Sequence, residues 1–121
     1  MKVGYVVLYV QDVDACMTFW TDSVGMVEKG RKPAGDFSIV KVGFADQEFS
    51  FELVPLELMK DNPQGLDLAT PSIAFYVSDL NSTHSKLAAN GVQATEPGAY
   101  MGMETFAFCD NENRWFAVIK N

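Results

Sequence analysis

The sequence predicts an α+β fold: two tandem βαβββ modules that form an open, cleft-shaped mixed sheet with helices on its outer face. Three observations predict it. The segment YVVLYVQDV at 5–13 resembles SIAFYVSDL at 72–80, helical apolar spacing follows each segment, and each helical stretch runs into a glycine, Gly25 or Gly91. Glycine often ends helices because it adopts the left-handed conformation without strain. A chain of 121 residues fits a single domain made of both modules.

The first module is predicted over residues 1–54. Alternating apolar residues at 5–10 indicate a strand, and Asp12 is a residue type that caps helix N-termini. A helix is then expected from the spacing of Val13, Cys16, Met17 and Trp20. The segments VEKGRK, DFSIVKVGFA and EFSFELV follow and predict three more strands.

Residues 55–71 are predicted to link the modules, because PLELMKDNPQGLDLATP contains prolines, a glycine and no clean period. The second module is predicted over 72–121 in the same order of elements. Its helix should begin after Asp79, since Leu80, Thr83, His84 and Leu87 have helical spacing. The segments VQATEP, MGMETFAFCD and RWFAVIK predict its remaining strands.

The predicted strands have two different faces, because residues two apart along a strand share a face. One face is wholly apolar, and we expect the two helices to cover it. The other mixes aromatic, small and acidic residues, a composition typical of small-molecule clefts; burial in a dimer interface is the alternative. This second face contains Tyr5, Val7, Tyr9, Glu48, Ser50, Glu52, Ser72, Ala74, Tyr76, Trp115, Ala117 and Ile119.

Charge and composition exclude several partners. A net charge of −7 does not suit nucleic acid, which needs basic patches on its partner. An acidic cleft favours cations, although solubility alone also explains the charge. No apolar run approaches the ~20 residues of a membrane span, and the N-terminus does not match a signal peptide. Cys16 and Cys109 lack zinc-site spacing, so we expect reduced thiols in a cytoplasmic protein.

Two segments carry a family resemblance: LYVQDVDACMTFWTDSVGM at 8–26 and AFCDNENRWFAVI at 107–119. They resemble the vicinal-oxygen-chelate superfamily, which includes lactoylglutathione lyases, extradiol dioxygenases, fosfomycin-modifying enzymes and bleomycin-resistance proteins. The resemblance covers the whole chain. Asn111 and Asn113 stand where the family usually has Pro and Gly, and Asn tolerates such turns. The resemblance implies a homodimer.

The resemblance also implies where a metal would bind. Metal-dependent members use one residue from the first and fourth strands of each module, and the matching positions here are Tyr5, Glu52, Ser72 and Ala117. Only Glu52 matches the family's usual ligands. A divalent ion needs several strong donors, so no metal cofactor is expected. The chain is closest in character to the metal-free, bleomycin-resistance-like members.

We therefore expect a metal-free protein that sequesters an aromatic or cationic small molecule, for instance an antibiotic. The alternatives are a glyoxalase- or dioxygenase-like enzyme in which Glu52 is a metal ligand or general base, and a structural or regulatory partner. No catalytic residue is assigned beyond that role for Glu52, and His84, on the second helix, is not expected to take part. The expected ligand-binding residues are Tyr5, Tyr9, Glu52, Ser72, Tyr76, Met101, Met103, Trp115 and Ala117.

Overall fold

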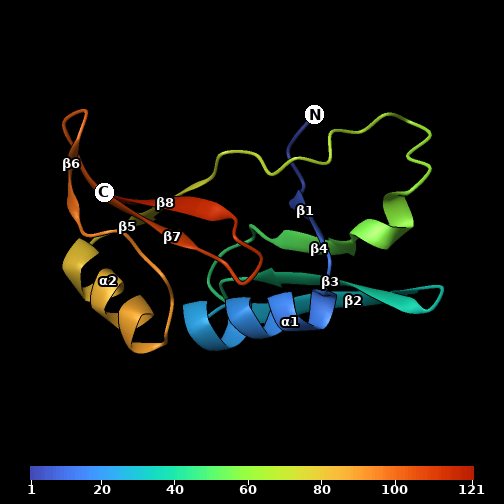
Figure 1. Cartoon of the computed structure of the whole chain (residues 1–121), viewed down its shortest axis with the longest axis horizontal. Helices are drawn as coiled ribbons and strands as arrows, with labels where there is room; N and C mark the ends of the chain where they lie inside the picture. Colours follow the sequence, from blue (N-terminus) through green and yellow to red (C-terminus); the bar gives the residue numbers. More distant parts are fainter. The chain divides into compact units, whose positions relative to one another are not determined.

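The computed structural model describes residues 1–121, which divide into two compact units, Met1–Thr70 and Pro71–Asn121. Each unit contains its own four-stranded mixed sheet and a main helix (Figure 1). The predicted α+β class and the repeated order of elements are confirmed. No helix of the chain has the length and apolar character needed to cross a membrane.

Unit 1 has the strand order β1-β4-β3-β2, in which β1 and β4 are parallel and the other neighbours antiparallel. After α1, a π-helical segment, η1, continues the helix, and a short 3-10 helix, η2, follows β4. The elements are β1 (Val6–Val10), α1 (Val13–Thr18), η1 (Phe19–Val24), β2 (Val27–Ala34), β3 (Phe37–Gly43), β4 (Phe51–Pro55) and η2 (Leu56–Met59).

The first helix begins and ends where the sequence predicts. The Ala15 backbone N–H donates to Asp12 Oδ1 at 3.0 Å, so Asp12 caps the helix. Gly25, with φ 98°, ends η1 in the left-handed conformation. The helix packs on β3 and β4, and Figure 1 shows it on the lower side of the unit 1 strands. The core beneath it is apolar, and the rings of Trp20 and Phe51 lie 5.0 Å apart between their centroids.

Unit 2 repeats the arrangement with the order β5-β8-β7-β6, in which β5 and β8 are the parallel pair. Asp79 caps α2 by accepting from the Ser82 backbone N–H at 3.0 Å. Stacked rings of Phe108 and Phe116 lie in the core. The elements are β5 (Ala74–Val77), α2 (Leu80–Ala89), β6 (Gly98–Tyr100), β7 (Met103–Cys109) and β8 (Trp115–Lys120).

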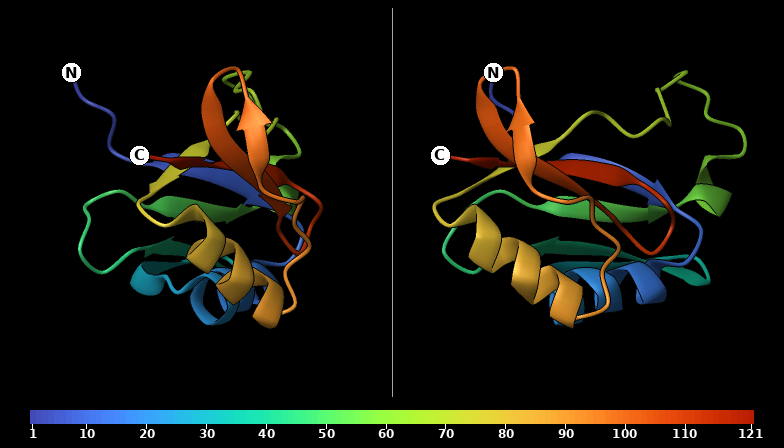
Figure 2. Two further views of the ribbon diagram at one scale, coloured as in Figure 1. Left: turned by 90° about the vertical axis from the view of Figure 1, so that its left-hand side faces the viewer. Right: turned by 60° about the vertical axis from the view of Figure 1, so that its left-hand side comes forward.

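One predicted strand of unit 2 is displaced. The prediction of a strand at 92–97 is wrong, because that segment forms one isolated bridge, Ala94 with Phe108, and a few separate hydrogen bonds to β7. Pro97 has no N–H to continue a ladder, and the strand β6 begins only after it. A tight turn joins β6 to β7, with Met101 and Gly102 both at positive φ. Figure 2 shows this hairpin projecting from unit 2.

Candidate functional site

The helix-free face of unit 1 is fixed by strand register. Phe51 and Leu53 of β4 are buried in the core, so Glu52 between them points to the opposite side. Glu52 is directly opposite Val7 on β1 and Lys41 on β3. Alternation along the strands then defines this face by Tyr5, Val7, Tyr9, Lys32, Ile39, Lys41 and Glu52.

Two lysines surround the Glu52 carboxylate. Lys32 Nζ lies 3.9 Å and Lys41 Nζ 4.0 Å from Glu52 Oε2. The Glu52 side chain is only 8% exposed, while those of Lys41 and Lys32 are 37% and 61% exposed. The carboxylate is therefore sheltered within the sheet face, and its charge is compensated by two ammonium groups that reach solvent.

An aromatic ring completes this cluster. Lys41 Nζ lies over the Tyr5 ring, 4.0 Å from its centroid, in a cation–π contact. Tyr5 is partly exposed and Tyr9 half-buried. The structure thus brings three predicted site residues, Tyr5, Tyr9 and Glu52, onto one face of unit 1.

Sequence reasoning missed the two lysines. Lys41 lies within DFSIVKVGFA and Lys32 closes VEKGRK, but alternation alone does not say which residue of a neighbouring strand lies opposite. The register Lys41 with Glu52 supplies that information, and opposite charges facing each other are a common way to stabilise a sheet. Glu52 is therefore a charge-compensated carboxylate with two lysines beside it.

The helix-free face of unit 2 is aromatic and apolar, with few charges. The register places Ala74 opposite Ala117 and Tyr76 opposite Ile119. Tyr76 is 72% and Trp115 47% exposed. We define this face by Ala74, Tyr76, Met103, Thr105, Ala107, Trp115, Ala117 and Ile119.

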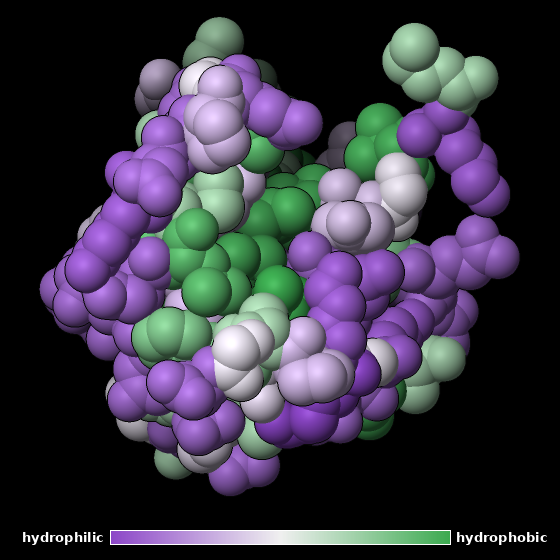
Figure 3. Space-filling view, turned by 90° about the vertical axis from the view of Figure 1, so that its right-hand side faces the viewer, coloured by the Kyte–Doolittle hydropathy of each residue, from purple (hydrophilic) through white to green (hydrophobic).

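Two predicted residues of unit 2 lie apart from its strands. Ser72 precedes β5 and is exposed. Met101 was expected to alternate with its neighbours along a strand, but it lies in the β6–β7 turn and is exposed there. Figure 3 views the chain from the side on which η2 and the β2–β3 turn lie in Figure 1, and it shows apolar residues in green among polar residues in purple.

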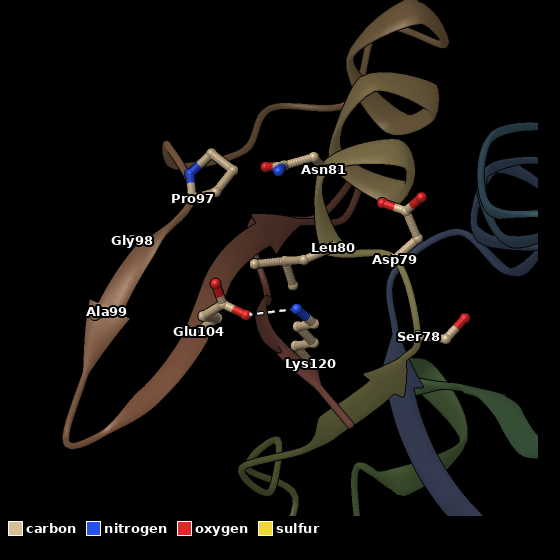
Figure 4. A pocket seen from close by; sticks show the side chains of 9 residues that line it. All are labelled: Ser78, Asp79, Leu80, Asn81, Pro97, Gly98, Ala99, Glu104 and Lys120. Carbon is tan, nitrogen blue, oxygen red and sulfur yellow. Dashed lines mark ion pairs between the residues drawn. The ribbon is translucent and has the colours of Figure 1, made fainter.

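A polar pocket of about 420 Å³ lies elsewhere in unit 2, beside the start of α2 (Figure 4). Lys120 and Glu104 form an ion pair there, with Nζ 3.0 Å from Oε2. None of the predicted site residues contributes to it. Its lining is Ser78, Asp79, Leu80, Asn81, Pro97, Gly98, Ala99, Glu104 and Lys120.

The donor set does not fit a divalent metal. Unit 1 offers Tyr5 and Glu52 at the family's metal positions, and unit 2 offers only the Ser72 hydroxyl and the Ala117 methyl group. No three His, Cys, Asp or Glu side chains are grouped as metal ligands would be. Moreover, Glu52 faces two ammonium groups, which repel a cation that approaches the same carboxylate.

The histidine and the two cysteines of the chain are packed within the fold. The His84 ring packs edge-on against Phe106, with centroids 5.1 Å apart. Both cysteines are free and buried. Burial, with a contribution from the Asp110 carboxylate, raises the pKa of the Cys109 thiol. That thiol is therefore protonated and poorly nucleophilic at neutral pH.

Known proteins share this fold and sequence pattern. The chain is 29% identical over 119 residues to the uncharacterised protein YetH of Bacillus subtilis (strain 168), covering 97% of this chain and 96% of YetH. TnmS3, an antibiotic binding protein from Streptomyces sp. CB03234, superposes with a TM-score of 0.81 at 16% identity, covering 99% of this chain and 95% of TnmS3. Lactoylglutathione lyase from Agrobacterium tumefaciens superposes with a TM-score of 0.74 at 16% identity, covering 99% and 93%.

The sequence also matches a protein family as a whole. Residues 2–117 match the description Glyoxalase/Bleomycin resistance protein/Dioxygenase superfamily. The match spans both modules, and it confirms the resemblance carried by the segments at 8–26 and 107–119. The chain therefore belongs to the glyoxalase/bleomycin resistance protein/dioxygenase superfamily.

Proposed function

We propose that this chain is a metal-independent binding protein that sequesters an aromatic small molecule, an antibiotic being one such ligand. The observation that carries the proposal is the helix-free face of unit 1. There the accessible ring of Tyr5 and the half-buried Tyr9 lie beside a sheltered, charge-compensated Glu52. Aromatic faces with a few fixed polar groups suit a planar ligand.

The similar structures include both a binding protein and an enzyme. TnmS3 is described as an antibiotic binding protein, whereas the lyase of the same fold is an enzyme. Function in a shared fold depends on the residues of the site. Here Glu52 is the one usual metal donor among the four positions that hold the metal in enzymes of the family, and this favours binding over metal-dependent catalysis.

The helix-free face of unit 2 is proposed as a second, separate set of ligand-binding residues. Tyr76 and Trp115 expose aromatic rings, and Ala117 leaves room beside them because its side chain is a methyl group. Ser72 and Met103 offer a hydroxyl and an adaptable thioether. We assign Met101 a role only at the tip of the β6–β7 hairpin.

The proposal includes the oligomeric state of the protein and its location in the cell. The family resemblance favours a homodimer. Two free, buried cysteines suit a reducing compartment, so a cytoplasmic location is part of the proposal.

To test the proposal, a neutral aromatic probe, 2-naphthamide, is titrated into the whole chain, and NMR chemical-shift mapping locates where it binds. The expected result is binding that perturbs the backbone signals around Tyr5 and Tyr9, is unchanged by EDTA, and weakens in Tyr5→Ala. Tyr100→Ala is the control, because Tyr100 is an exposed tyrosine on β6.

Elemental analysis of protein purified without chelator completes the test. A stoichiometric metal, together with probe binding that EDTA abolishes, would overturn metal independence and favour the enzyme alternative with Glu52 as ligand. A probe that perturbs only residues outside the two helix-free faces would show that the site lies elsewhere.

A further inference from the structure

We infer that the ligand of the unit 1 face is an aromatic acid, whose anionic group is held by Lys32 and Lys41. This inference rests on the proposed function and names the class of ligand. It reverses the expectation, drawn from net charge, that the site attracts cations.

The local charge on this face is positive. Lys32 and Lys41 contribute two positive charges, and Glu52 is the only carboxylate within 4.0 Å of either ammonium group. Glu28 pairs with Arg31 at 2.7 Å, and Arg31 contacts Met17 of α1 on the other side of the sheet. The net charge of −7 therefore does not describe this surface, since short-range binding responds to the nearest groups.

The lysines retain the capacity to donate hydrogen bonds to a ligand. A charge-assisted hydrogen bond has a donor–acceptor distance of about 2.7–2.9 Å, shorter than the 3.9 and 4.0 Å separations from Glu52 Oε2. An ammonium group has three N–H donors. Glu52 thus holds the two lysines near each other by charge without occupying their donors, and a ligand carboxylate is a suitable acceptor.

The aromatic part of the ligand has a defined place beside these charges. Lys41 is fixed over one face of the Tyr5 ring, so an acid held by Lys41 brings its own ring close to Tyr5. Tyr9, four residues later on the same face, extends the aromatic surface. A cationic ring system placed there would instead meet two ammonium groups and be repelled.

Three probes of nearly equal shape and different charge test the inference: 2-naphthoate, 2-naphthamide and 2-naphthylmethylammonium. Each is titrated into the whole chain by calorimetry, with NMR mapping, at low and at moderate salt. Naphthoate is expected to bind at least about tenfold more tightly than naphthamide. This preference should decrease as salt increases.

Substitutions identify the groups responsible. Lys41→Gln and Lys32→Gln should each weaken naphthoate binding several-fold and leave naphthamide binding nearly unchanged. Glu52→Gln should strengthen naphthoate binding, because it removes the one competing negative charge. Lys86→Gln is the matched control, since Lys86 is an exposed lysine on α2, and it should change nothing.

The outcomes separate this inference from the proposed function. If naphthamide binds near Tyr5 and Tyr9 as tightly as naphthoate, the binding function stands and the acid preference is wrong. If the cationic probe binds best and Glu52→Gln weakens it, the inference is also wrong. If none of the three probes binds, the proposed function fails and this inference fails with it. Circular dichroism checks folding, and the two lysine variants suffice if Glu52→Gln does not fold.

Discussion

Lys41 and Glu52 lie directly opposite each other on β3 and β4, with Lys41 Nζ 4.0 Å from Glu52 Oε2. The same lysine contacts the ring of Tyr5. One cross-strand pair therefore connects a sheltered carboxylate, an aromatic ring and a solvent-accessible cation. This relationship sets the charge of the helix-free face of unit 1.

The pair should contribute modestly to stability. A double-mutant cycle with Lys41→Met and Glu52→Gln is expected to give a coupling of about 0.5–1 kcal/mol, because Lys41 is partly exposed and screened by solvent. Urea unfolding of the four proteins measures it. Glu48→Gln, an exposed carboxylate before β4, should show no coupling with Lys41→Met. A coupling of several kcal/mol would mean that the pair is a structural element of the core.

Asp110 is expected to contribute much more than Glu52 to the stability of the folded protein. Its fully buried side chain accepts from the backbone N–H groups of Glu112 and Arg114, both at 2.9 Å, and from Arg114 Nη1 at 3.0 Å. Asp110→Asn should lower the free energy of unfolding by about 2–4 kcal/mol, since the partly buried Arg114 loses the more buried of its two carboxylate partners and keeps only Glu112. Glu112→Gln is the control and should cost less. Equal urea midpoints for the two variants would contradict this prediction.

Truncation of the two tryptophans should lower stability by very different amounts. Trp20 is fully buried and packs on Phe51, so Trp20→Ala should lower the free energy of unfolding by about 3–5 kcal/mol. Trp115 lies on the helix-free face of unit 2 and is about half exposed, so Trp115→Ala should cost less than about 1 kcal/mol. Urea unfolding and thermal unfolding measure the stability lost in each variant. A large loss in Trp115→Ala would indicate that this ring is buried by another molecule, such as a second copy of the chain.

Stability should decrease at alkaline pH through Cys109. Burial raises the pKa of this thiol above its ordinary value of 9.0, so the folded protein holds the thiol proton more tightly than the unfolded chain does. The thiol's contribution is therefore complete below about pH 9 and is lost as pH rises through the folded pKa. Between pH 8 and pH 10.5, Cys109→Ala should lose less stability than the unsubstituted protein, measured by urea unfolding. Identical losses would show that the thiol does not contribute.

Much of the fold could be predicted because its signals are local. Asp12 and Asp79 cap their helices by hydrogen bonds to residues three positions later, and the pattern that predicts this lies within a few residues. The strand predicted at 92–97 is wrong, since Pro97 interrupts pairing and a turn at Met101 and Gly102 creates β6 instead. The pairing of β6 with β7 depends on the conformation of the turn between them. The pattern of apolar residues does not reveal that conformation.

The site was less predictable because it depends on register. Alternation placed Tyr5, Tyr9 and Glu52 on one face, and the structure shows them there. The neighbours of Glu52 belong to other strands, however, and a shift of one residue would remove Lys41 from that face. The roles of the predicted binding residues remain predictions.

The parallel pairing of β1 with β4 has a consequence for the order of folding. Val6 pairs with Phe51, so β1 can join the sheet only once β4, the last strand of the module, has been synthesised. The antiparallel neighbours β2–β3 and β3–β4 join nearby segments and pay little loop-closure entropy. During synthesis β1 leaves the ribosome before the other strands of its module. It stays unpaired until its partner, β4, has also emerged. The second module shows the same delay, because β5 pairs with β8, the last strand of that module, with Ala74 opposite Ala117.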